Sequence, residues 1–176
     1  DHYLVPSNTT VDSNPKIVNQ IFEDQSVLMM VVKKIIRHKN HPIRHNNLEM
    51  LAWKIIELCS PETLNYQDRD GNSVIHYTCL MESFSVGLLG LMQECGADFS
   101  LVNQRGETPL MLVANSMALD DLKFIHAYTS KDMINAKDKN GYTALMRAVR
   151  GRRANNVLFL LDNGADIYVR DNAGLT

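Results

Sequence analysis

Apolar residues recur at helical spacing along the first third of the chain. Residues 15–22 carry one apolar stripe, residues 26–37 are strongly apolar before a basic end, and residues 47–59 present another apolar face. Each pattern predicts a helix, and the basic end of the second suits the negative end of a helix dipole. The first stripe consists of Ile17, Val18, Ile21 and Phe22. Residues 39–45, between the second and third helices, are expected to form a loop.

The rest of the chain repeats a pattern of a polar turn followed by a short apolar segment. The turns align on Gly71, Gly106, Gly141 and Gly174, which are 35, 35 and 33 residues apart. A tight turn with positive φ favours glycine, because a residue without Cβ adopts that conformation freely. Two residues after each glycine stands a hydroxyl side chain that can cap a helix N-terminus. These capping residues are Ser73, Thr108, Thr143 and Thr176.

Each turn is followed by the pattern of two short helices. Pro109 occupies a first helical turn, where its missing N–H has no cost. Residues 144–150 and 155–162 predict the clearest such pair, and Gly96 and Gly164 are expected to end second helices as left-handed caps. A sequence that repeats at this period predicts a solenoid of stacked helix pairs.

These motifs resemble the ankyrin-repeat family, whose consensus runs Gly-x-Thr-Pro-Leu-His-x-Ala and closes with Leu-Leu-x-x-Gly-Ala-Asp. The third repeat matches this consensus at residues 141–145 and 160–166, and the resemblance covers about residues 64–176. It implies an all-α ankyrin-repeat solenoid of helix-turn-helix units with short β-turn or hairpin tips. Degenerate-repeat helices are expected to cap this stack at its N-terminus, because a solenoid needs a cap at each open end.

The resemblance also implies boundaries for the units. These are a flexible segment at 1–14, a helical cap or degenerate repeat at 15–63, repeats at 64–98, 99–134 and 135–166, and the start of a truncated repeat at 167–176. The second repeat ends irregularly, because residues 126–132 replace its Gly-Ala-Asp motif. Met111 and Met146 stand where the consensus has a histidine, which His76 retains. We expect the chain to be a fragment of a longer protein in which more repeats follow.

Composition, charge and the absence of known motifs argue against several classes of function. The net charge is −2, so no strong field points to nucleic acid or a membrane, and the longest apolar run is too short to cross a bilayer. No nucleophile elbow, phosphate loop, HExxH or dinucleotide fingerprint occurs, so we predict no catalytic residue, cofactor or small-molecule substrate. Three cysteines without CxxC spacing indicate a reduced intracellular compartment, cytoplasmic or nuclear. They are Cys59, Cys79 and Cys95.

His38, His41 and His45 form a cluster in the predicted loop. Their spacing raises the hypothesis of a zinc site that regulates the cap. Without a nearby cysteine pair, however, a closed four-ligand site is hard to assemble. We therefore interpret them as solvated loop side chains and predict no metal ligand, which analysis of untagged protein for bound zinc would test.

Four arginines occur together without an acid among them: Arg147, Arg150, Arg152 and Arg153. Arginine suits bidentate binding of carboxylate or phosphate, although such stems also lie over neighbouring side chains on ordinary solvated surfaces. Direct nucleic-acid binding is disfavoured, because the chain is slightly acidic and Tyr142 is the one aromatic residue near the patch. An acidic segment of a partner protein is the preferred target.

In the ankyrin family the turn tips and the exposed side of the first helices line a concave binding surface. Carried onto this sequence, the predicted protein-binding residues are Arg69, Asn72, Leu80, Met81, Arg105, Glu107, Asn115, Lys139, Asn140, Tyr142, Arg150, Arg152 and Arg153. Tyr142 and Arg150 are expected to contribute most, since tyrosine and arginine are enriched among residues that dominate interface energetics. Positions that keep their type across repeats are expected in the core. They are Ile75, Leu110, Ala114, Leu145 and Ala148.

The sequence therefore favours a non-catalytic protein-interaction scaffold within a larger intracellular protein. Similar stacks occur in inhibitor-of-kappa-B proteins and in the Notch intracellular region, which favours a role in signalling or transcription regulation. The alternative is a targeting or regulatory arm of an enzyme or channel whose chemistry lies outside this fragment.

Overall fold

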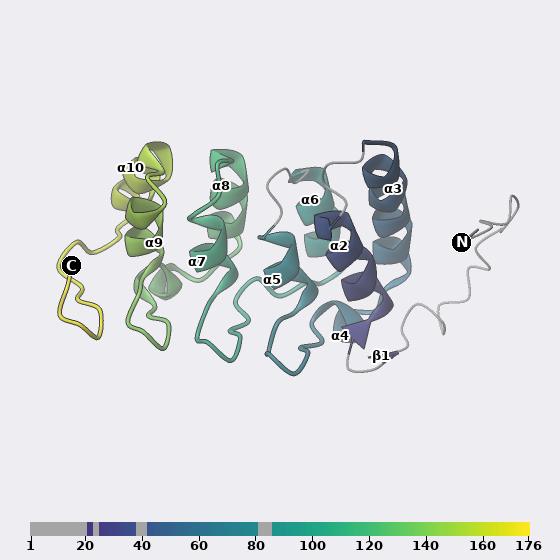
Figure 1. Cartoon of the computed structure of the whole chain (residues 1–176), viewed down its shortest axis with the longest axis horizontal. Helices are drawn as coiled ribbons and strands as arrows, with labels where there is room; N and C mark the ends of the chain where they lie inside the picture. Colours follow the sequence, from purple (N-terminus) through teal and green to yellow (C-terminus); the bar gives the residue numbers. More distant parts are fainter. Residues whose placement is uncertain (1–20, 23–24, 38–41, 81–85) are drawn as a thin grey trace, which may run out of the picture.

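The helices stack in two parallel rows (Figure 1). The computed structural model describes residues 21–22, 25–37, 42–80 and 86–176. The first-helix row contains α2 (Val27–Arg37), α5 (Val74–Thr78), α7 (Pro109–Val113) and α9 (Ala144–Arg150). The second-helix row contains α3 (Pro42–Leu58), α6 (Val86–Glu94), α8 (Leu119–Ala127) and α10 (Ala154–Asp162). Each helix packs against the next in its own row, as expected of a repeat stack.

The turns that precede the first helices are built alike. In the third repeat Gly141 has φ of 84°, and Asp138 Oδ1 accepts the backbone N–H groups of Asn140 and Tyr142. One backbone hydrogen bond joins each turn to the next. These bonds are Gln104 N to Asp70 O at 2.9 Å, Lys139 N to Arg105 O at 2.9 Å and Asn172 N to Asn140 O at 3.0 Å. All six glycines that the sequence assigns to turns or caps have positive φ, which confirms that prediction.

The predicted caps begin two of the first helices. Thr108 Oγ1 accepts Met111 N–H at 3.2 Å, and Thr143 Oγ1 accepts Met146 N–H at 3.3 Å. Ser73 differs, because its hydroxyl lies 2.9 Å from Nδ1 of His76 and its backbone N–H donates to the same nitrogen. These caps satisfy N–H groups that a helix of five to seven residues would otherwise leave without partners.

The core runs between the two rows along the stack. All five framework positions predicted from the repeats are buried, at 0–7 % exposure. His76 is fully buried among them, and its Nε2 lies 3.2 Å from the carbonyl oxygen of Glu107 in the next repeat. Because Nδ1 accepts from Ser73, Nε2 carries the proton and donates to Glu107. Burial lowers the pKa of His76, which favours this neutral form.

The N-terminal third departs from the prediction at several places. Instead of a helix, Ile21–Phe22 form the short strand β1, which pairs antiparallel with β2 (Gln25–Ser26). An extended Ser26 can cap α2, and its hydroxyl accepts the N–H of Met29. The predicted loop is also too long, since α3 begins at Pro42, a residue well suited to a first helical turn.

Two further short helices each lie between a second-row helix and the turn that follows it. The helix α4 (Pro61–Leu64) follows α3 and is capped by Ser60. The 3₁₀ helix η1 (Lys131–Asn135) occupies the irregular end of the second repeat. The pair α2 and α3 packs against α5 and α6 in the position of a preceding repeat. Within the described residues, every helix is too short or too polar to span a bilayer.

Candidate binding surface

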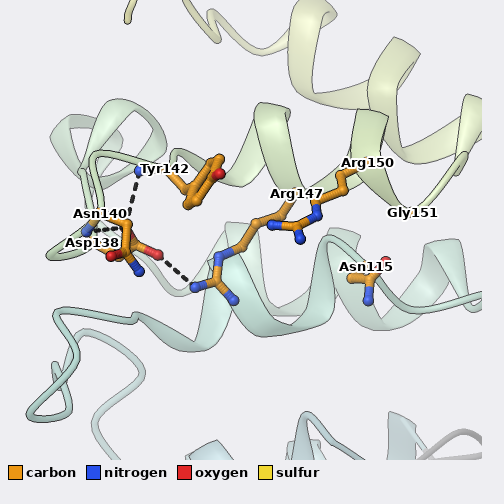
Figure 2. A pocket seen from close by; sticks show the side chains of 7 residues that line it. All are labelled: Asn115, Asp138, Asn140, Tyr142, Arg147, Arg150 and Gly151. Carbon is orange, nitrogen blue, oxygen red and sulfur yellow. Dashed lines mark hydrogen bonds and ion pairs between the residues drawn. The ribbon is translucent and has the colours of Figure 1, made fainter. Parts of the chain in front are cut away.

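A pocket of about 500 Å³ lies between the second and third repeats (Figure 2). It is lined by Asn115, Asp138, Asn140, Tyr142, Arg147, Arg150 and Gly151. The helix α9 provides both arginines, the turn before it provides Asp138 to Tyr142, and Asn115 follows α7. The pocket therefore joins side chains from two neighbouring repeats.

Arg147 crosses the base of this pocket and connects two turns. One of its Nη atoms lies 2.8 Å from Oε1 of Glu107 and 2.6 Å from Oδ2 of Asp138. Both carboxylates are nearly inaccessible to solvent. Arg105 Nε also donates a hydrogen bond to Oε2 of Glu107 at 2.8 Å. Burial alone would raise the pKa of Glu107, but hydrogen bonds from Asn103, Arg147 and Arg105 outweigh it and lower that pKa to about 2. The positive charge of Arg147 is therefore neutralised by two carboxylates of the protein itself.

Arg150 presents its charge to solvent beside an aromatic ring. Its guanidinium carbon lies 5.6 Å from the centroid of the Tyr142 ring, within cation–π range. Within the part of the chain that the structure describes, Arg150 makes no ion pair and donates no hydrogen bond. Tyr142 and Arg150 also line a second pocket of about 390 Å³, whose other walls are mostly apolar. This pair therefore lines both pockets.

Gly151 lets the side chain of Asn115 cover the end of α9. A Cβ at position 151 would lie 1.9 Å from Oδ1 of Asn115. A hydrogen bond holds the backbone at Asn115, because Arg153 Nε donates to its carbonyl at 2.9 Å. Asn156 Nδ2 also donates to the carbonyls of Ala114 and Ser116, both at 3.0 Å. The pocket wall is thus held in place by α10 and the loop before it.

The structure brings four of the predicted binding residues into one pocket. They are Asn115, Asn140, Tyr142 and Arg150. Arg69, Leu80, Arg105, Lys139 and Arg152 are exposed elsewhere on the stack, while Arg153 is half-buried. Met81 lies outside the described residues, as do His38 and His41 of the histidine cluster. Among the described residues, no group of three potential metal ligands occurs.

Two predicted binding residues, Asn72 and Glu107, are buried instead, at 8 % and 7 % exposure. Each follows a turn glycine, a position predicted to lie at the exposed tip. Nδ2 of Asn103 donates to both, at 2.9 Å to Asn72 Oδ1 and 2.7 Å to Glu107 Oε2. Their side chains therefore hold neighbouring turns together, and the prediction that they lie at exposed turn tips was wrong.

The four-arginine cluster also needs correction, because the fold brings acids to Arg147 from other segments. Of the other pocket residues, Asp138 was not predicted, and Arg147 was predicted only as part of the arginine cluster. One signal was available for Asp138: an Asp or Asn precedes each turn glycine by three residues, at Asp68, Asn103, Asp138 and Asp171. Burial raises the pKa of the Cys59 thiol to about 12 and also raises the pKa values of Cys79 and Cys95, which disfavours the reactive thiolate form of all three.

Comparison with known families agrees with this architecture. The family model described as ankyrin repeats (3 copies) matches residues 80–171, more than half of the chain. The chain belongs to the ankyrin-repeat family. Ankyrin-repeat domains are generally non-catalytic modules that bind other proteins, which is the broad class of function that the sequence predicted.

Two curated proteins illustrate the range of relatives of this ankyrin-repeat chain. An "Intracellular phospholipase A2" of Caenorhabditis elegans is 36 % identical over 101 residues, which are 55 % of this chain and 9 % of the phospholipase. A "Probable 26S proteasome regulatory subunit p28" of Saccharomyces cerevisiae is 25 % identical over 136 residues, which are 75 % of this chain and 59 % of that subunit. The chain thus spans less than two thirds of either relative.

Proposed function

We propose that this ankyrin-repeat chain is a protein-interaction scaffold that binds its partner at the pocket containing Tyr142 and Arg150. The observation that carries the proposal is the pair itself. An exposed guanidinium lies beside an aromatic ring in a pocket built from two repeats. Tyrosine and arginine are the residue types enriched where interface energy concentrates.

The framework beneath the pocket supports this function. Hydrogen bonds between turns and the ion pairs of Arg147 fix the pocket walls before any partner arrives. A preorganised surface loses less conformational entropy when it binds, so more of the contact energy remains as affinity. Since each repeat contacts only its neighbours, exposed tips can vary without disturbing the fold.

Affinity capture from cell lysate tests the proposal. The wild-type chain is compared with Tyr142→Ala/Arg150→Glu, and the folding of both is verified by circular dichroism. We expect a partner to be retained by the wild type and lost by the double variant. Arg37→Glu serves as the control, because Arg37 is an exposed arginine at the end of α2, a first-row helix at the other end of the stack.

Retention of the same partners by the wild type and the double variant would show that the binding surface lies elsewhere. Loss with Arg37→Glu as well would indicate a general effect of charge on binding. Only a loss confined to the pocket variant supports the proposed surface.

A second candidate is the regulatory arm of an enzyme. The match to only 9 % of the length of a phospholipase favours it, because the relative places similar repeats within a much longer protein. Western blotting with an antibody against residues 86–176 distinguishes the two candidates. If the antibody detects a much longer polypeptide, and that polypeptide has lipase activity, the result favours the regulatory arm of an enzyme.

The proposal extends to location and role. We infer a place in the cytoplasm or nucleus and a role in signalling or transcription regulation. The support is the resemblance of the turns to ankyrin stacks of that kind, together with relatives whose names include an intracellular enzyme and a proteasome regulatory subunit.

A further inference from the structure

We propose that the pocket binds a carboxylate side chain from an acidic segment of the partner protein, with Arg150 as the group that contacts it. This inference rests on the proposed function, because it identifies the partner's chemistry at the same pocket.

The charges of the ion pairs around Arg147 cancel. Arg105 and Arg147 carry two positive charges, and Glu107 and Asp138 carry two negative charges in the same set of ion pairs. The charge of Arg150 is therefore left uncompensated in the pocket. Residues 139–161 contain no acidic side chain, whereas Arg152 and Arg153 follow the pocket directly. The pocket thus attracts negative charge, although the whole chain is slightly acidic.

The pocket also offers free donors in the right place. Arg150 donates no hydrogen bond to the described residues, so its planar N–H groups can bind a carboxylate in the bidentate way. The side-chain amides of Asn115 and Asn140 line the same pocket and make no hydrogen bond with the described residues. They can pair with the backbone of an extended segment on either side of its acidic residue. Tyr142 limits where the guanidinium of Arg150 can lie.

A carboxylate fits this arrangement better than a phosphate does. One uncompensated guanidinium matches one negative charge, whereas a phosphate group carries close to two at neutral pH. Arg105 and Arg147 are already paired with Glu107 and Asp138, so the pocket has no further unpaired cation to balance the second charge. Nucleic acid would require a broader set of cations along its backbone.

Binding of three synthetic peptides to the whole chain tests the inference. The peptides alternate glycine with glutamate, glutamine or phosphoserine, have equal length and have capped ends. Fluorescence anisotropy gives Kd, and NMR at millimolar peptide follows the side-chain amides of Asn115 and Asn140. We expect the glutamate peptide to bind at least about tenfold more tightly than the others, as a hydrogen-bonded charge pair would produce. Its binding should weaken as salt is added.

Variants locate the contact. Arg150→Gln should weaken glutamate-peptide binding about tenfold, whereas Arg37→Gln, the same change at the other end of the first-helix row, should leave it unchanged. Tyr142→Phe keeps the ring and should retain binding, while Tyr142→Ala should weaken it. Because Arg150 is exposed, its variant should fold normally.

Several outcomes would overturn the inference. These are equal binding of the glutamate and glutamine peptides, tighter binding of the phosphoserine peptide, absence of binding at millimolar concentration, or equal effects of the two arginine variants. If lysate capture depends on Tyr142 and Arg150 but the glutamate peptide fails, the scaffold stands and the carboxylate inference falls. If the peptide binds while no captured partner depends on these residues, the proposed function falls instead.

Discussion

At the scale of single residues, the ionised form of Glu107 stabilises the fold. Asn103, Arg105 and Arg147 all donate to its carboxylate, and they hold its pKa near 2 despite burial. In the unfolded chain the same carboxyl group titrates near 4.5. A group whose pKa falls on folding contributes stability above its unfolded pKa, and that contribution is lost as the pH drops toward the folded pKa.

Glu107→Gln is therefore expected to lower the free energy of unfolding by about 3 kcal/mol at pH 7, from the shift in pKa. The difference from wild type should shrink as the pH falls from about 4.5 to about 2. Urea denaturation at pH 7 and at pH 3 measures it. Glu57→Gln is the control, because the exposed pair of Glu57 with Lys54 should contribute less than about 1 kcal/mol at either pH. An undiminished difference at pH 3 would contradict the electrostatic account.

Asp121 has the opposite effect. It is 4 % exposed on α8, and burial, together with the charge of Asp120, raises its pKa to about 6. It lies beside Thr78 and Cys79 of the preceding repeat, where the Thr78 hydroxyl is buried without a hydrogen-bond partner among the described residues. A carboxyl group whose pKa rises on folding stabilises the fold below its unfolded pKa of 3.8 and loses that contribution as the pH rises through about 6.

Asp121→Asn should accordingly stabilise the protein above pH 6. The shift corresponds to about 3 kcal/mol, from which the lost interaction with the N-terminal dipole of α8 subtracts about 1 kcal/mol. We expect a gain of about 2 kcal/mol in the free energy of unfolding at pH 7.5. No such gain is expected at pH 3.5, where the carboxyl group is neutral. Urea denaturation of the variant and of the exposed control Asp162→Asn checks this, and a gain independent of pH would refute it.

At the scale of elements, the turns do more than connect helices. Gly71, Gly106 and Gly141 combine a left-handed conformation with close contact to the next turn. A Cβ at Gly141 would lie 2.7 Å from the backbone nitrogen of Asn172, and one at Gly71 would lie 2.6 Å from that of Gln104. Gly90, within α6, has open space around it and an ordinary helical conformation. The same substitution at the two kinds of site should therefore have opposite effects.

Gly141→Ala should lower the free energy of unfolding by about 2 kcal/mol or more. The left-handed conformation costs alanine about 1 kcal/mol, and the clash would displace the hydrogen bond from Asn172 N to Asn140 O. Gly90→Ala should instead raise it by about 0.5–1 kcal/mol, because alanine favours a helix and restricts the unfolded chain. Chemical denaturation of both variants measures the two effects. A loss with Gly90→Ala would argue against this account of the turns.

At the scale of the whole molecule, the repeat period predicted the stack, because glycines and hydroxyl caps fall at fixed offsets. It located the framework core and α9 without error. It misplaced Asn72 and Glu107, because their burial depends on contacts between repeats, from Asn103 to Asn72 and from Arg147 to Glu107. The neutralisation of Arg147 was equally invisible, because its acids come from two separate turns. Around Ile21 and Phe22, a short apolar stripe did not distinguish a strand from a helix.

The pocket is built from two repeats, so the free energy of partner binding is coupled to the free energy of packing those repeats together. A ligand that contacts both Asn115 and Arg150 binds only while the third repeat is docked on the second. By linkage, every increment of affinity at that pocket also stabilises the packing of the third repeat on the second. Conversely, conditions that loosen this repeat release the partner, so dissociation and local unfolding share one equilibrium.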